Sequence, residues 1–297
     1  MRRMEWAVLF AVLALVVAAC GGGAEEPSTT GPPETTTAPA PTEAEHEGGG
    51  RTVEAFTGTI AVDGDPSDWA DATGLDMTLE SIEGVDVESK TASVKVAYDD
   101  ESVYVLFTVD DDFNWNADEA HLSGSAAVMW AIDVGAGEHM GTEDEAGEGP
   151  SLGMVDIWHW ELECALGEDQ GGAVSDPGEG APGNDGACNF DDEFATDPEE
   201  RFDDGDPEGP GGSGAENSLL GVFSHTNPVE DGEGTWTFEM SRPLQTGDSQ
   251  DAQLSAGGTG MMALAYWDPD ISPEGWDDDQ HVQSANQGWI EVHFEAE

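Results

Sequence analysis

One short run of the chain holds most of the side chain types that bind ligands. Residues 154–160, Met-Val-Asp-Ile-Trp-His-Trp, contain two indoles, an imidazole, a thioether and a carboxylate. Their alternation with a period of two predicts a β-strand that carries Trp158 and Trp160 on one face. Two indoles on one face build either a wall of the hydrophobic core or a wall of a pocket for a flat ligand. The run alone favours neither interpretation.

Carboxylates are too common in this chain to mark a catalytic site. The sequence has 65 Asp and Glu against seven Lys and Arg, and a formal net charge of −58. No nucleophile with a neighbouring base and no facing pair of acids stands out from this background. No glycine-rich phosphate loop precedes a helix either. We therefore predict a protein that is not an enzyme on its own.

The charge also restricts the partners and the environment. Nucleic acid is excluded as a partner, because contacts to phosphates need cations that this surface lacks. The ten Trp and ten Phe lie in patterned runs, so the chain is not a disordered acidic polymer. An acidic surface with only two lysines indicates adaptation to high salt, where screening reduces the repulsion between carboxylates.

A turn at residues 62–69 brings three carboxylates close together in the sequence. Asp63, Asp65 and Asp68 offer oxygen ligands of the kind that calcium prefers. Their spacing departs from the EF-hand loop, however, so a solvated acidic turn is the alternative. In either case Trp69 is expected to point into the core.

The first fifty residues predict export and a lipid anchor. Residues 1–19 combine two arginines with an apolar run, and Val-Ala-Ala precedes Cys20, which resembles the lipobox of bacterial lipoproteins. Residues 20–50 then predict a lipidated cysteine and a flexible linker rich in Gly, Pro, Thr, Glu and Ala, outside the cytoplasm. In such an oxidising compartment, Cys164 and Cys188 are expected to form a disulfide.

The rest of the chain, residues 51–297, is predicted to be one all-β domain. Alternating runs predict at least eight strands, among them a hairpin of residues 91–97 and 102–109, and no helical periodicity follows the first nineteen residues. We expect a two-sheet antiparallel β-sandwich. Residues 167–218 contain few apolar runs and are predicted to form a long acidic loop, which the disulfide would close.

Three segments together resemble one family, the haem-binding domain of the ethylbenzene dehydrogenase gamma subunit. Its relatives are the cytochrome b subunits of type II DMSO-reductase-like enzymes. The segments are residues 60–69 with the hairpin that ends at 103–105, residues 155–160, and residues 234–244 with 267–289. The first of them also resembles family 9 carbohydrate-binding modules.

The resemblance implies a β-sandwich that binds one b-type haem without covalent attachment. Consistent with this, the chain contains no Cys-x-x-Cys-His. Family members commonly supply Met from the loop before the central strand and Lys from a C-terminal loop. Here the corresponding residues are Met140 and His281, and the absence of the lysine loosens the match at that position. Met and neutral His are both standard axial ligands of haem iron.

Two other residues compete for the first ligand position. His139 stands beside Met140, and Met154 lies nearer to the central strand. Trp158 and Trp160, with Trp130, Trp267 and Trp289 as further candidates, would wall the haem pocket. The resemblance thus implies an electron-transfer module, tethered to the membrane through Cys20, whose partner is a molybdenum oxidoreductase or a cytochrome.

The alternative function is a cell-surface carbohydrate-binding module. In that case the same pair of indoles would sandwich a sugar ring, and the acidic turns would hold calcium.

Overall fold

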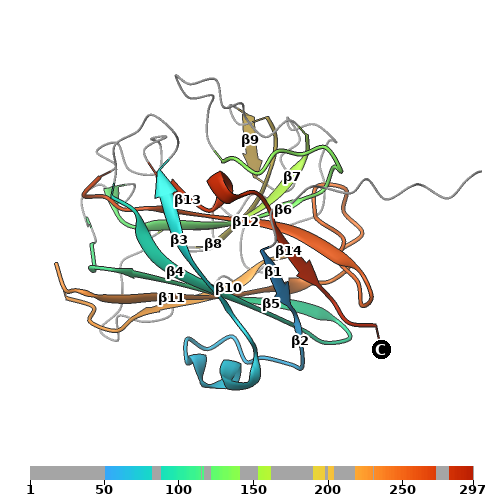
Figure 1. Cartoon of the computed structure of the whole chain (residues 1–297), viewed down its shortest axis with the longest axis horizontal. Helices are drawn as coiled ribbons and strands as arrows, with labels where there is room; N and C mark the ends of the chain where they lie inside the picture. The colour runs from blue at the N-terminus through green and yellow to red at the C-terminus, as the bar shows by residue number, and fades with distance from the viewer. Residues whose placement is uncertain are drawn as a thin grey trace, which may run out of the picture. The chain divides into compact units, whose positions relative to one another are not determined.

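The structure is a computed structural model of the whole chain (Figure 1). It describes residues 51–81, 88–114, 116, 122–140, 153–161, 190–197, 200–203, 218–229, 231–271 and 281–296. The chain divides into two units, Met1–Glu43 and Ala44–Glu297, and all the described residues belong to the second. The predicted signal peptide, Cys20, the linker, Cys164 and Cys188 therefore lie outside the described residues.

The described residues form two layers of strands with two short 3-10 helices (Figure 1). The first sheet contains β2 (Phe56–Thr57), β3 (Leu75–Ser81), β4 (Lys90–Tyr98), β5 (Ser102–Asp111), β10 (Leu220–His225) and β11 (Gly234–Pro243). The second contains β1 (Thr52–Glu54), β6 (Ser125–Ala131), β7 (Val155–Glu161), β8 (Phe190–Asp197), β9 (Glu200–Asp203), β12 (Thr259–Trp267), β13 (Val282–Gln283) and β14 (Ile290–His293). The 3-10 helices are η1 (Pro66–Asp71) and η4 (Ala285–Gln287). None of the described helices is long and apolar enough to cross a membrane.

The two sheets are continuous at one edge. The strand order is β10-β11-β5-β4-β3-β13-β12-β6-β7-β8-β9, and the pairing of β3 with β13 joins the layers. All neighbours in this order are antiparallel. The short strands β1 and β2 lie outside this order and pair in parallel with β14 and β4.

Aromatic side chains from both layers fill the space between them. The ring of Trp160, on β7, lies 4.7 Å from that of Phe238 and 5.2 Å from that of Trp236, both on β11. The inward residues of β4, β5, β6, β7, β11 and β12 are almost completely buried, and the residues between them point away. This confirms the predicted all-β sandwich.

The hairpin of β4 and β5 shows why this part of the fold could be predicted. Val94 pairs with Phe107 and Val96 with Val105, so the alternating apolar residues meet on the core face. The turn is fixed by Asp99, whose carboxylate accepts hydrogen bonds from the backbone N–H groups of Glu101 and Ser102, both at 2.9 Å. An aspartate that bonds to its own turn in this way favours a tight reversal.

The acidic segment 167–218 contains two strands in its described part. β8 pairs along β7, and β9 pairs with β8. The expected long loop is therefore interrupted by an extension of the second sheet. Strand β8 was not predicted because its sequence is rich in charged residues. In the structure, Asp192 and Glu193 are buried instead of facing water.

Candidate functional site

The face of the second sheet that points away from the inter-sheet core carries a separate cluster of small and apolar side chains. Along β6, β7 and β12 the residues alternate between the two sides of the sheet. The side chains on the outer side are Ala127, Met129, Val155, Ile157, Ala263 and Ala265. We call this surface the alanine face. The three alanines, on the neighbouring strands β6 and β12, are at most 1% exposed, so other groups already cover them.

The segment that follows β6 lies against the alanine face and ends at Met140. Ala136 and Met140 pack in the same cluster as the alanines. The indole N–H of Trp289 donates to the carbonyl oxygen of Ala136 at 3.3 Å. The backbone N–H of Met140 donates to Oε1 of Gln283 at 2.9 Å. These two bonds hold the segment in place, so the position of Met140 is set by residues near the C-terminus.

His281 reaches the same face from the C-terminal part of the chain. Val282, on β13, points into the inter-sheet core, so its neighbours His281 and Gln283 point the other way. Gln283 is the residue that binds Met140. The ring of His281 lies 4.6 Å from that of Trp267, a member of the alanine-face cluster, and His281 is 1% exposed. The fold thus brings Met140 and His281, far apart in the sequence, to one face of one sheet.

The chemistry of these donors fits a haem iron. A thioether and an imidazole are both common axial ligands, and the surrounding side chains are apolar, as a porphyrin requires. Trp267 and Trp289 border the face. Because the face is covered in this structure, a haem would fit there only if the covering groups move aside.

The other residues predicted for the site lie elsewhere. Trp158 and Trp160 are 0% exposed and point into the inter-sheet core with Trp130, because they occupy the inward positions of β7 and β6. They are core walls and do not border the alanine face. Met154 is half-buried at the start of β7 and does not pack in the alanine-face cluster. His139 is half-buried beside Met140.

A buried chain of polar groups lies on the same side of the second sheet as the alanine face and was not predicted. Nε2 of His159 lies 2.8 Å from Oγ of Ser125, and Nδ1 lies 3.4 Å from Oε2 of Glu193. The order Ser, His, Glu is that of a hydrolase triad, but the Ser125 hydroxyl donates to the carbonyl oxygen of Trp160 at 2.8 Å. Ser125 and His159 are also 0% exposed. No substrate can reach such a hydroxyl from solution, so the group braces β6, β7 and β8.

The carboxylates of the turn at residues 62–69 accept hydrogen bonds from backbone N–H groups. Asp65 caps η1 by accepting from the N–H of Ser67, at 3.0 Å, while Asp68 accepts from the N–H of Ala61 at 3.1 Å. Asp63 likewise accepts from the N–H of Asp65, at 3.0 Å. Within the described residues, acidic side chains converge at two other places, and each already contains a Lys or Arg. Calcium binding at this turn stays a prediction.

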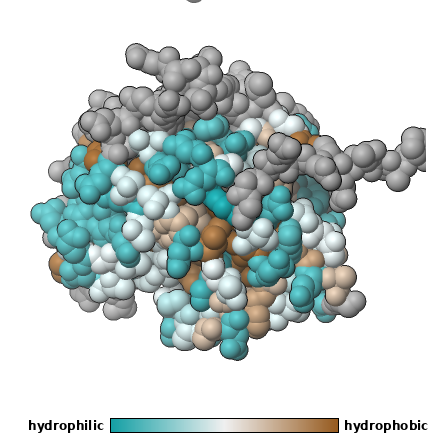
Figure 2. All heavy atoms as spheres, viewed as in Figure 1, coloured by the Kyte–Doolittle hydropathy of each residue, from teal (hydrophilic) through white to brown (hydrophobic). Residues whose placement is uncertain are grey.

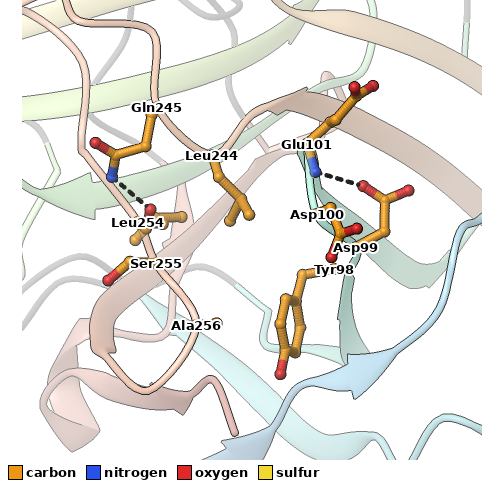
Figure 3. Close-up of a pocket in the computed structure, with 9 residues that line it drawn as sticks. All are labelled: Tyr98, Asp99, Asp100, Glu101, Leu244, Gln245, Leu254, Ser255 and Ala256. Atoms are coloured by element: carbon orange, nitrogen blue, oxygen red, sulfur yellow. Dashed lines mark hydrogen bonds between the residues drawn. The ribbon is translucent and has the colours of Figure 1, made fainter. Parts of the chain in front are cut away.

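A hollow of about 500 Å³ lies beside the turn between β4 and β5 (Figure 3). The β4–β5 turn forms one side and the segments around Leu244 and Leu254 form the other. Asp99 is fully engaged in the turn. Partial burial alone would raise its pKa, but hydrogen bonds from backbone N–H groups and from the hydroxyls of Thr59 and Tyr104 lower it to about 2. Its neighbours Asp100 and Glu101 are exposed. The hollow therefore has an acidic rim and a partly apolar floor.

Comparisons with known proteins identify the family of the chain. Two solved structures of a family 9 carbohydrate-binding module from Caldicellulosiruptor kristjanssonii, in complex with glucose and with cellotriose, are similar to the chain at 11% identity. The alignments cover 83% of this chain and 97% and 95% of the module, with TM-scores of 0.39 and 0.40. No curated protein matches the chain. The profile of ethylbenzene dehydrogenase, however, matches residues 66–279, which is well over half of the sequence. The chain belongs to the ethylbenzene dehydrogenase family.

Proposed function

We propose that this protein is a non-catalytic module that binds one b-type haem at the alanine face and transfers electrons. The observation that supports this most strongly is the convergence of Met140 and His281 through Gln283. Membership of the ethylbenzene dehydrogenase family is in keeping with it. Haem with one Met and one His ligand would supply reversible one-electron transfer at a relatively high potential.

Each part of the alanine face has a separate task in this proposal. Met140 and His281 hold the iron, and the hydrogen bonds to Gln283 and Ala136 keep the Met140 segment against the sheet. The short side chains of the alanines, which are covered in this structure, would let a flat ring lie close to the sheet once uncovered. Trp267 would orient the imidazole of His281 by ring contact at 4.6 Å. We further propose that Cys20 tethers the module outside the cytoplasm, next to a molybdenum oxidoreductase or a cytochrome.

Haem titration of the purified full-length protein tests the proposal. We expect a Soret band that saturates at one haem per chain, and an affinity at least tenfold lower for Met140→Ala and for His281→Ala. Met154→Ala is the matched control, because this methionine lies outside the cluster, and it should bind like the wild type. No Soret band, or equal binding by all variants, would contradict the assignment.

The hollow between the β4–β5 turn and residues 244–256 favours a second candidate function, carbohydrate binding. It places exposed carboxylates, the amide of Gln245 and the hydroxyl of Ser255 beside Leu244 and Leu254. Hydrogen-bonding groups next to apolar surface are what a sugar ring requires. The carbohydrate-binding modules similar in fold were solved with glucose and cellotriose. Stacking on Trp158 or Trp160 has no part in this version, since both are buried.

Calorimetric titration of the haem-free protein with cello-oligosaccharides separates the two functions. Binding that is lost in Glu101→Ala with Gln245→Ala, but kept in His281→Ala, would support the carbohydrate site. Absence of any heat with these sugars would count against it.

A further inference from the structure

A cluster of three aspartates and one arginine lies buried between the sheets, away from the alanine face. Arg242 reaches from β11 across the core to the second sheet. Its Nη1 lies 2.6 Å from Asp156, 2.9 Å from Asp251 and 3.5 Å from Asp192. All four side chains are at most 2% exposed. One guanidinium thus ties β7, β8 and the segment after β11 together.

The backbone bonds around the cluster fix the carboxylates in place. Oδ2 of Asp156 accepts from the N–H of Ala252 at 2.9 Å, and Nη2 of Arg242 donates to the carbonyl oxygen of Ala252 at 2.8 Å. Oδ2 of Asp192 accepts from the N–H and the hydroxyl of Ser218, both at 3.2 Å. The cluster is therefore rigid and cannot turn its carboxylates towards solvent.

The charges of this cluster do not balance if all the aspartates are ionised. Three carboxylates and one guanidinium leave two negative charges in a region that excludes water, which is very unfavourable. Oδ1 of Asp156 and Oδ1 of Asp192 have no hydrogen-bond donor among the described residues. The carboxylates converge, with one oxygen of each of the three aspartates within 4.8 Å of the others. A metal ion would compete with Nη1 for the centre of this group, whereas a proton would not.

We propose that Asp156 and Asp192 together retain one proton at neutral pH. The contact between the two sheets would then consist of one carboxylic acid and one carboxylate, both beside Arg242. The charged groups that face the pair are Arg242, from β11, and Asp251, from the segment that follows it. Burial raises the pKa of Asp156 well above its usual range and that of Asp192 to about 6; Arg242 opposes the shift and Asp251 adds to it. Because the two groups interact, the proton belongs to the pair.

The retained proton makes the tie sensitive to pH. In its protonated form the cluster has one negative charge less, and the two sheets stay joined through Arg242. When the proton leaves at higher pH, the extra buried charge weakens the tie between β11 and the β7–β8 edge of the second sheet. The structure thus contains a pH-dependent contact in its core, independent of any ligand at the alanine face.

Infrared spectroscopy of the full-length protein in D₂O tests this proposal. We expect a carbonyl stretching band of a protonated carboxyl group at neutral pH that disappears as the pH is raised. The band should be lost in Asp192→Asn and in Asp156→Asn. It should remain in the control Asp76→Asn, which changes an exposed residue of β3.

A second buried carboxyl provides a stricter control. Asp111, at the end of β5, is also buried with a raised pKa, so Asp111→Asn must leave the pH-dependent band of the pair in place. If the variants of the pair do not fold, the test rests on Asp111→Asn: its band should still be present at neutral pH and should disappear as the pH is raised. Absence of the band at neutral pH, or its persistence in both Asp156→Asn and Asp192→Asn, would overturn the proposal.

Discussion

At the scale of single residues, Glu239 organises the acidic turn that precedes β3. This buried residue of β11 accepts from the indole N–H of Trp69 at 2.8 Å. Its other oxygen accepts from the backbone N–H groups of Asp63 and Gly64, at 3.0 and 2.6 Å. Gly64 has a φ of +81°, which glycine adopts without strain. One carboxylate therefore fixes the turn that the sequence suggested as a calcium loop.

Replacement of Glu239 should destabilise the protein without any added ligand. Glu239→Ala leaves three buried or partly buried donors without their acceptor, so we expect the free energy of unfolding to fall by about 2–3 kcal/mol. Trp69→Phe removes one donor only and should cost less. Urea denaturation measures both, with Glu80→Ala, an exposed residue of β3, as the control. A loss no larger than that of the control would show that the turn does not depend on Glu239.

A second buried cluster of charged groups, separate from that of Arg242, is predicted to make stability depend on pH. Nζ of Lys90 lies 2.6 Å from Asp111 and 2.5 Å from Asp268. Burial raises the pKa of Asp111 to about 6, and Asp268 adds to this effect, while Lys90 opposes it. A group whose pKa is higher in the folded state than in the unfolded state binds more protons when folded. Its contribution to stability is complete below about pH 4 and is lost as the pH rises through about 6.

We therefore expect the free energy of unfolding to decrease between pH 5 and pH 7.5 at constant high salt. Asp111→Asn should make this decrease shallower, because it removes one of the titrating groups. Urea denaturation at the two pH values measures the difference. A free energy that increases with pH over this range would contradict the assignment of Asp111.

At the scale of elements, the strands that could be predicted are those with one face in the core and the other exposed to water. β4, β5 and β7 alternate clearly, and their positions were predicted to within a few residues. β3 carries the same signal, with Met77 and Leu79 inward and exposed residues between them, but was overlooked. β8 could not be predicted, since Asp192 and Glu193 bind Arg242 and His159 in the interior, and sequence alone does not pair residues so far apart.

The site was predictable only in part for the same reason. Met140 and His281 came from a family resemblance, and the hydrogen bond of Met140 to Gln283 explains why both lie on one face of the sheet. The alanine face gave no chemical signal, because alanine carries no reactive group. Trp158 and Trp160 gave a strong signal that belonged to the core. The residue types pointed to candidate ligands, but only the strand register showed on which side of the sheet each residue lies.

Arg242 should be the most sensitive single position for the contact between the sheets. Arg242→Met leaves Asp156, Asp192 and Asp251 buried around an apolar group, so we expect a loss of about 3–5 kcal/mol. The loss should be smaller in a triple variant in which Asp156 and Asp192 are also Asn. Thermal denaturation followed by circular dichroism compares the variants. Equal stability of Arg242→Met and the wild type would contradict the role of this residue as a tie.

At the scale of the whole molecule, the net charge of −58 dominates solution behaviour. Figure 2 shows hydrophilic residues spread over much of the described surface on one face, with hydrophobic residues between them. Repulsion among surface carboxylates acts over a Debye length of about 10 Å at 0.1 M salt and about 3 Å at 1 M. Salt should therefore stabilise this fold.

We expect the melting temperature to rise by several degrees between 0.1 M and 2 M KCl. The rise should be steepest at low salt, where the screening length changes most, and smaller at pH 5, where part of the surface charge is neutralised. Differential scanning calorimetry of the full-length protein measures both. A melting temperature that does not change with salt would mean that surface repulsion is unimportant here.

Ligation of haem iron by Met140 and His281 is tested most directly by near-infrared magnetic circular dichroism of the oxidised, haem-loaded protein. This method detects the charge-transfer transition between a thioether sulfur and low-spin ferric iron. We predict the band in the wild type and in Met154→Ala, and its loss in Met140→Ala. Its absence from the wild type, or its persistence in Met140→Ala, would contradict haem ligation at the alanine face.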